Sequence, residues 1–504
     1  MNIVLNREKR NNIFILIVCL MTLSGVVSSA VVLLDSGRPP CYRLLWLLPA
    51  VFCFNCLLVY TFRKMLFTRI SITMMTGLYW IRMVVTPVVM VLGGYAVVPE
   101  NTSWQAYMDK AILLECYEAC IMFALLSLWS KKLTCENRNP YPLGNTEKFR
   151  YSKLFFLVFG LICLFFFGMI LRWPTLIRYR FIPIWGAPEG WVIRVFEQRS
   201  IRGTGSGPLG IFVTQWSRLI LIMQILLPAV ILTWILNHRR PWTNTKKAVC
   251  VFLLAGAVFV IATNSRINSV YAALALLLTL ISYSSGKQLR MEAVFLLLVP
   301  AFALLTLCVT MSGGANTSET IFPQLSRIFT AYFSGPQNTA AAIQAAADRH
   351  GPNPFLIAGD MVQHIPDLGA IWKNLAGRPL PADCADLFNQ TLYGVTEGRK
   401  WDQLVSPIGE GYMHGGFLLA PLIPAVTARL SVWMEQNARK SRSPVFKNLC
   451  YAGAEFMACA QVEFSIGQAM SFLWYIGVMA LIALPIVVKW RSIREHKPIG
   501  TAVP

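Results

Sequence analysis

Charged residues are scarce in this chain of 504 residues, where they make up only 14% of positions, and histidine occurs only five times. A soluble domain usually carries about 25% charged residues, so this shortage is typical of a protein surrounded by lipid. Apolar residues fill 56% of the chain, in runs that extend from near the N-terminus to near the C-terminus. This composition excludes a disordered chain, a coiled coil and a small disulfide-rich secreted domain, and it predicts a polytopic membrane protein.

Clustered metal ligands are also lacking. The 13 cysteines are scattered, mostly inside apolar runs such as the one that holds Cys53 and Cys56, and no cysteine and histidine cluster has the spacing of a metal site. We therefore expect no metal and no cofactor. Cys41 and Cys384 are the cysteines that we place in outer loops, where an oxidising exterior would allow one disulfide between them.

Windows of roughly 20 apolar residues predict about 12 transmembrane helices, with a range of about 11 to 13 because several runs are short. The windows lie near residues 13–34, 44–62, 70–92, 107–129, 154–171, 210–236, 248–263, 269–283, 291–311, 417–434, 446–464 and 473–488. The first is similar to a signal peptide, but its apolar run continues through Leu34, so we expect an uncleaved helix. The expected fold is an all-α polytopic membrane protein.

The positive charges predict the orientation of these helices. The net charge of +21 would suggest nucleic acid as a partner of a soluble protein, but in a polytopic protein most of the excess is topogenic, and we expect no nucleic acid. Basic pairs stand at 63–64, 131–132, 239–240, 246–247 and 439–440, in loops that all face one side if Met1 does. Both termini are therefore predicted in the cytoplasm.

These spans divide the chain into five parts. They are helices 1–5 (1–171), an arginine-rich outer loop (172–209), helices 6–9 (210–311), a large and partly helical outer loop (312–416), and helices 10–12 with a cytoplasmic tail (417–504). The large outer loop far exceeds the usual connection of about 2 to 8 residues between bundled helices, and loops of such length are usually functional or disordered. Its segment Thr339 to Ala347 should be helical, because alanine and glutamine are strong helix formers.

The first outer loop carries six arginines and no lysine on the side where basic residues should be depleted. Guanidinium groups bind phosphate and carboxylate oxygens in a bidentate manner, so we expect a diphosphate to bind here. The candidates are Arg178, Arg180, Arg194, Arg199 and Arg202 in this loop, together with Arg266 in a short outer turn rich in asparagine and serine. The alternatives are an interfacial belt on lipid headgroups for the loop and a snorkelling side chain for Arg266.

The end of the second outer loop holds a candidate acid–base pair. Glu410 and His414 are four residues apart and would share one face of a helix, where general-base catalysis is possible. Glycines at 409, 411, 415 and 416 argue against a helix, so we expect Glu410 in a turn just outside the tenth span. The alternative is a solvated loop in which Glu410 pairs with an arginine or caps a helix.

Three charges lie within the predicted spans at similar depths. Arg82 belongs to the third span, and Glu115 and Glu118 belong to the fourth. An ion pair would offset the several kcal/mol that an unpaired charge costs at mid-membrane. We expect a structural ion pair, with a proton path as the alternative.

Three segments resemble the Wzy class of polysaccharide polymerases, in its O-antigen and capsule branch. They are TNSRINSV (263–270), TAYFSGPQNTAAAI (330–343) and QLVSPIGEGYMHGGFLLAPL (403–422). That class also has arginine-rich outer loops with an arginine, ten residues and then a glycine, a pattern that Arg199 to Gly210 and Arg194 to Gly205 both match. The second loop contains no comparable match.

The resemblance implies an enzyme of the bacterial cytoplasmic membrane that joins undecaprenyl-diphosphate-linked oligosaccharide repeat units on the outer face. It also suggests, by fold analogy with membrane glycosyltransferases, a GT-C-like fold. The lipid-linked oligosaccharide would be both donor and acceptor, membrane lipid would surround the protein, and a chain-length regulator protein is a candidate partner. Arginines would disperse the charge of the leaving diphosphate without a metal, Glu410 or His414 would take the acceptor proton, and direct displacement would invert the anomeric centre.

Two other functions stay open. A lipid-linked oligosaccharide flippase or transporter would use the buried charges along a path through the bundle, namely Arg82, Glu115, Glu118, Glu455 and Glu463. It would have little use for a loop of roughly 100 residues on one side. A ligase of the O-antigen type, which transfers the finished polymer to another acceptor, would share the chemistry of the polymerase.

Overall fold

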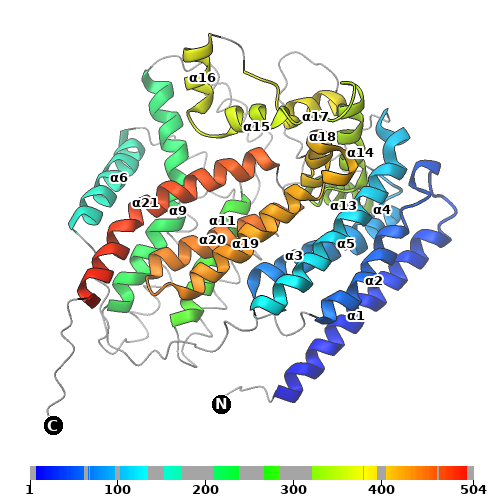
Figure 1. Cartoon of the computed structure of the whole chain (residues 1–504), viewed down its shortest axis with the longest axis horizontal. Coiled ribbons are helices and arrows are strands. Elements are labelled where there is room, and N and C mark those ends of the chain that lie inside the picture. The colour runs from blue at the N-terminus through cyan, green and yellow to red at the C-terminus, as the bar shows by residue number, and fades with distance from the viewer. Residues whose placement is uncertain are drawn as a thin grey trace. The chain divides into compact units, whose positions relative to one another are not determined.

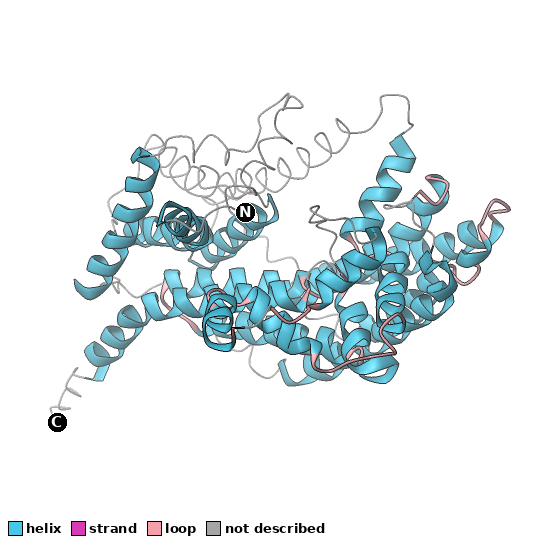
Figure 2. Ribbon diagram, turned by 90° about the horizontal axis from the view of Figure 1, so that it is seen from above, coloured by secondary structure: helices cyan, strands magenta, loops and turns pink. Residues whose placement is uncertain are grey.

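The computed structural model of the chain describes residues 7–61, 66, 69–96, 103–133, 153–172, 208–237, 266–283, 321–377, 380–393, 405–462 and 465–495. Across these ranges the regular secondary structure consists of helices and contains no strand (Figures 1 and 2). The chain forms two compact units. Unit 1 comprises Met1–Pro140, Ala315–Glu435 and Ala454–Trp474, and unit 2 comprises Tyr141–Gly314, Gln436–Gly453 and Tyr475–Pro504.

Unit 1 contains the long apolar helices of the N-terminal region. They are α1 (Arg7–Leu34), α2 (Leu47–Thr61), a continuous helix made of α3 (Ile70–Trp80), η2 (Ile81–Val85) and α4 (Thr86–Leu92), and α5 (Met108–Leu133). Large apolar side chains such as Leu34, Leu57 and Leu128 point outward from them, with more than half of their surface exposed. Such faces suit lipid and would be unfavourable in water, so these helices belong in a membrane.

In the described ranges, five helices are long and apolar enough to cross a membrane, or six if one bent pair counts as a span. Four of the five coincide with the first four predicted spans, and the fifth is the apolar part of α21 (Ile466–Glu495). The expected all-α fold is thus confirmed for the described residues, and their apolar helices are consistent with a multi-pass membrane protein. The predicted total of about 12 spans stays a prediction, because the windows at 248–263 and 291–311 lie outside the described residues.

A helical hairpin from the segment 312–416 packs among the helices of unit 1. Its arms are α13 (Ile321–Tyr332), which lies against α4, and α14 (Pro336–Ala347), which lies against α5 and α18 (Pro407–Leu419). Figure 1 shows α14 beside α18. Almost every side chain of α14 is buried, because alanines on several of its faces permit close approach. The expected helix at 339–347 is confirmed, and it lies within the core of the unit.

Three further helices of this segment lead from the hairpin to α18. They are α15 (Leu356–His364), α16 (Leu368–Ala376) and α17 (Cys384–Tyr393). Helix α15 approaches the start of α17 so closely that a Cβ atom on Gly359 would lie 1.9 Å from the carbonyl oxygen of Ala382. Glycine at 359 is therefore required for this contact.

The glycine-flanked turn predicted at Glu410 is wrong, because Glu410 lies in helix α18. Ser406 caps the helix by accepting a hydrogen bond from the backbone N–H of Gly409. The glycines serve close packing instead: a Cβ atom on Gly411 would lie 2.1 Å from the carbonyl oxygen of Ala420. Gly416 has φ of 71°, and the chain bends by 111° between α18 and α19 (Leu422–Lys440). The span predicted at 417–434 therefore begins at the end of α18, crosses this bend and continues into α19.

Unit 2 contains α6 (Lys153–Arg172), α9 (Pro208–Asn237) and α11 (Arg266–Tyr283), together with parts of α20 (Pro444–Cys459) and α21. Asn448 links three of these helices: its amide donates to the carbonyl of Ile225, and its side-chain oxygen accepts from Thr279. The helices α6, α9 and α11 coincide with predicted spans near 154–171, 210–236 and 269–283.

Candidate functional site

A buried charge cluster lies at the centre of unit 1. Arg82 Nη2 lies 3.0 Å from Glu115 Oε1, and Arg82 Nη1 lies 2.8 Å from Glu118 Oε2. All three side chains are almost completely shielded from solvent. The structure therefore contains the pairing that was expected from the equal depths of these residues, with one guanidinium between two carboxylates.

The helix that carries Arg82 is widened at this point. Residues Ile81–Val85 form one turn of π-helix inside an otherwise α-helical span, and such bulges are frequent at functional sites. Arg82 Nε donates to the backbone carbonyl of Ser334, 3.2 Å away, at the tip of the α13–α14 hairpin. The arginine thus binds two carboxylates on α5 and one carbonyl of the hairpin.

Hydroxyl groups connect this charge cluster to the start of α18. Tyr79 donates to Glu118 over 2.9 Å, and Thr339 on α14 donates to Glu115 over 2.7 Å. The Thr339 hydroxyl also lies 3.1 Å from that of Ser406, the residue that caps α18. Sequence reasoning missed Ser334, Thr339 and Ser406, because isolated hydroxyl groups in alanine- and glycine-rich stretches form no recognisable spacing motif.

Glu410 lies in the first turn of α18 and is fully buried. Its Oε2 accepts a hydrogen bond from the backbone N–H of Ile466, the first residue of α21, where the helix dipole favours a negative charge. Its Oε1 has no hydrogen-bond partner among the described residues. Glu410 therefore caps a helix with one oxygen, as the alternative interpretation expected, and its other oxygen is buried without a hydrogen-bond partner among the described residues.

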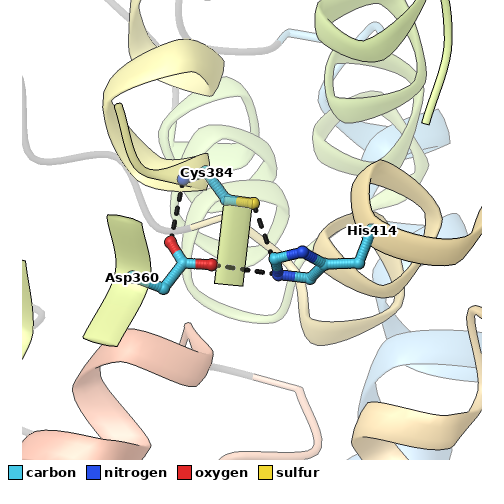
Figure 3. A group of neighbouring side chains, drawn as sticks. All are labelled: Asp360, Cys384 and His414. Atoms are coloured by element: carbon cyan, nitrogen blue, oxygen red, sulfur yellow. Dashed lines mark hydrogen bonds and ion pairs between the residues drawn. The ribbon is translucent and has the colours of Figure 1, made fainter. Parts of the chain in front are cut away.

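His414, one turn further along α18, belongs to a second cluster with Asp360 and Cys384 (Figure 3). His414 Nε2 lies 2.9 Å from Asp360 Oδ2 and 3.5 Å from Cys384 Sγ. In a Cys–His–Asp catalytic triad the thiol and the carboxylate contact different ring nitrogens. Here both contact Nε2, so the arrangement does not activate Cys384 as a nucleophile.

The surroundings of this second cluster are acidic. Burial raises the pKa of the Cys384 thiol, and the carboxylates of Asp360 and Glu410 raise this pKa further. Burial also raises the pKa of Asp383 to about 6. Within the described residues, no lysine or arginine forms an ion pair with Asp360, Asp383 or Glu410.

The disulfide that was considered between Cys41 and Cys384 is absent, since both are free thiols. The Cys384 side chain is buried and turned toward His414. Sequence reasoning placed Cys384 in an outer loop and therefore missed its contact with the histidine.

Five of the six predicted diphosphate-binding arginines lie outside the described residues: Arg178, Arg180, Arg194, Arg199 and Arg202. Arg266 is the first residue of α11 in unit 2.

No family model, no curated protein and no solved structure matches the chain.

Proposed function

We propose that the chain is a membrane glycosyltransferase that joins undecaprenyl-diphosphate-linked oligosaccharide repeat units, a polymerase of the Wzy class. One observation carries the proposal. Two of the three segments on which the resemblance rests, 330–343 and 403–422, contribute α14 and α18, which pack against each other in unit 1. Their contact joins Thr339 to Ser406 and continues to Glu115 and Arg82.

The proposed reaction is a direct displacement at the anomeric carbon of the donor. The acceptor hydroxyl oxygen forms the new glycosidic bond, the bond to the diphosphate breaks, and undecaprenyl diphosphate leaves with the electron pair. Glu410 takes the proton of the acceptor hydroxyl through Oε1, the oxygen that α21 does not use. His414 is the second choice as base. The arginines at 178, 180, 194, 199, 202 and 266 stabilise the charge of the leaving diphosphate.

A flippase or transporter is the less favoured alternative. Of the buried charges that suggested it, Arg82, Glu115 and Glu118 are engaged with one another. Glu455 is fully buried and neither of its carboxylate oxygens has a hydrogen-bond partner among the described residues, and Glu463 lies outside those residues. A transport path would need polar groups that remain available to a passing substrate. A ligase remains the enzymatic alternative, and the acceptor in the assay distinguishes it from a polymerase.

The proposed setting is the outer face of the bacterial cytoplasmic membrane. About 12 spans and both termini in the cytoplasm would place the loops 172–209 and 312–416 outside. Lipid-linked repeat units are the substrates, and a chain-length regulator is the proposed protein partner.

The test is a polymerisation assay with the purified chain in lipid vesicles and a lipid-linked repeat unit, with the products sized on a gel. We expect a ladder of polymers from the wild type. General-base loss typically costs about 100- to 10,000-fold in rate, so Glu410→Gln should abolish the ladder while the protein still folds. Glu455→Gln is the matched control, because Glu455 is also a fully buried carboxylate in unit 1.

Three results would contradict the proposal. Wild-type protein that moves the repeat unit across the membrane without joining it would be a flippase. Transfer to a different acceptor lipid alone would indicate a ligase. A loss below about tenfold in Glu410→Gln would remove Glu410 as the base.

A further inference from the structure

The cluster of Asp360, Cys384 and His414 brings three different metal-ligating atoms to one point (Figure 3). Each side chain comes from a separate helix: α15, α17 and α18. The oxygen, sulfur and nitrogen atoms lie within 4.8 Å of one another, and the side chains are buried or nearly so.

The separations fit a tetrahedral metal centre. Zinc binds cysteine sulfur at about 2.3 Å and histidine nitrogen at about 2.0 Å, so two such ligands of one ion lie roughly 3.5 Å apart. Cys384 Sγ and His414 Nε2 are separated by 3.5 Å. The nitrogen and oxygen ligands of such an ion lie about 3.3 Å apart, whereas His414 Nε2 and Asp360 Oδ2 are 2.9 Å apart. The third pair, Cys384 Sγ and the Asp360 carboxylate oxygen, lies within 4.8 Å, against roughly 3.6 Å for two such ligands of one zinc ion. A shift of up to about 1 Å would therefore complete the geometry.

The backbone already orients two of these ligands. Asp360 Oδ1 accepts a hydrogen bond of 2.9 Å from the backbone N–H of Cys384, which leaves Oδ2 directed toward His414. Gly359, next to Asp360, permits the close approach of α15 to Ala382 that this hydrogen bond requires. Such supporting contacts are typical of metal sites, where they fix the orientation of the ligands.

The charge of the cluster also favours a cation. Asp360 is buried and contacts a ring nitrogen, while Asp383 and Glu410 add acidic groups nearby.

We propose that Asp360, Cys384 and His414 bind one divalent transition-metal ion of the zinc type, with a fourth coordination position open. The cysteine selects a soft or borderline ion over Mg²⁺ or Ca²⁺, which prefer oxygen ligands. The ion joins α15, α17 and α18, and it binds His414 through Nε2. Metal binding does not depend on the proposed polymerase activity.

The test measures metal binding by the purified full-length protein after chelation and reloading. We expect about one Zn²⁺ per chain by mass spectrometry of the metal content, and a higher melting temperature with Zn²⁺ but not with Mg²⁺. With Co²⁺, a near-ultraviolet charge-transfer band should report the thiolate ligand. Asp360→Asn, Cys384→Ser and His414→Asn should each weaken Zn²⁺ binding by at least about tenfold.

The matched controls are Cys450→Ser and His350→Asn. Cys450 is a buried cysteine outside the cluster, and His350 is an exposed histidine. Both variants should bind Zn²⁺ as the wild type does. The proposal is wrong if the wild type gains no stability from Zn²⁺, if the cluster variants bind like the controls, or if bound Co²⁺ lacks the thiolate band. The wild-type melting measurement decides even if a cluster variant does not fold.

Discussion

At the scale of single residues, Arg82 shows what sequence reasoning can and cannot recover. Depth along two predicted helices was sufficient to expect its contact with Glu115 and Glu118, since an unpaired charge in a membrane is costly. The hydrogen bonds to Ser334 and from Thr339 were not foreseeable. They come from a segment more than 200 positions further along the chain, and a hydroxyl or a carbonyl carries no periodic signal.

We predict that Arg82→Met destabilises the protein by about 3 to 5 kcal/mol, because it leaves two buried carboxylates without their partner. Thermal unfolding in detergent measures the effect. The triple variant Arg82→Met, Glu115→Gln, Glu118→Gln should recover part of the loss, since it removes the unpaired charges as well. Arg43→Met is the control: Arg43 pairs with Asp109 at an exposed position, so its loss should change stability little. An equal effect in Arg82→Met and Arg43→Met would contradict the prediction.

At the scale of helices, regions of regular hydrophobicity were predictable and glycine-rich regions were not. The first four spans were located from their apolar runs alone, because a membrane helix needs a long apolar stretch. The four glycines in 406–416 predicted a turn. Glycine is equally required, however, where a neighbouring helix or a carbonyl oxygen leaves no room for a side chain. The glycines of α18 allow it to contact Ala342 on α14 and to bend back at Ala420.

Gly411→Ala tests this role of glycine. Its new Cβ atom would lie 2.1 Å from the backbone oxygen of Ala420, so the chain must shift, and we predict a loss of about 1 to 3 kcal/mol. Gly77→Ala in α3 is the matched control, because a Cβ atom there meets nothing within 4 Å. Alanine favours helix over glycine by up to about 1 kcal/mol, so this control should be neutral or stabilised. Melting temperatures that fall equally in both variants would contradict the packing explanation.

At the scale of the whole molecule, composition predicted an all-α membrane protein, but it did not predict how the segment 312–416 is built. A long stretch of mixed composition between apolar runs was expected as a large, partly helical outer loop. Helix α14 instead lies in the core of unit 1, because its alanines and small polar residues can pack closely where lipid is excluded, and α13 packs against α4. Helices within the core do not need the continuous apolar sequence of a lipid-facing span, so hydropathy alone does not detect them.

Labelling of introduced cysteines with a membrane-impermeant thiol reagent tests the orientation that the basic loops predict. Leu375 in α16 is 84% exposed, so Leu375→Cys should react in intact cells if the segment 312–416 faces outward. Gly500→Cys in the C-terminal tail should react only after permeabilisation, because the positive-inside rule places that end in the cytoplasm. The wild type, with its native cysteines, gives the background to subtract. If Leu375→Cys reacts only after permeabilisation, the predicted orientation is wrong and the segment 312–416 faces the cytoplasm. The candidate site would then lie away from the outer face, where the proposed function joins lipid-linked repeat units.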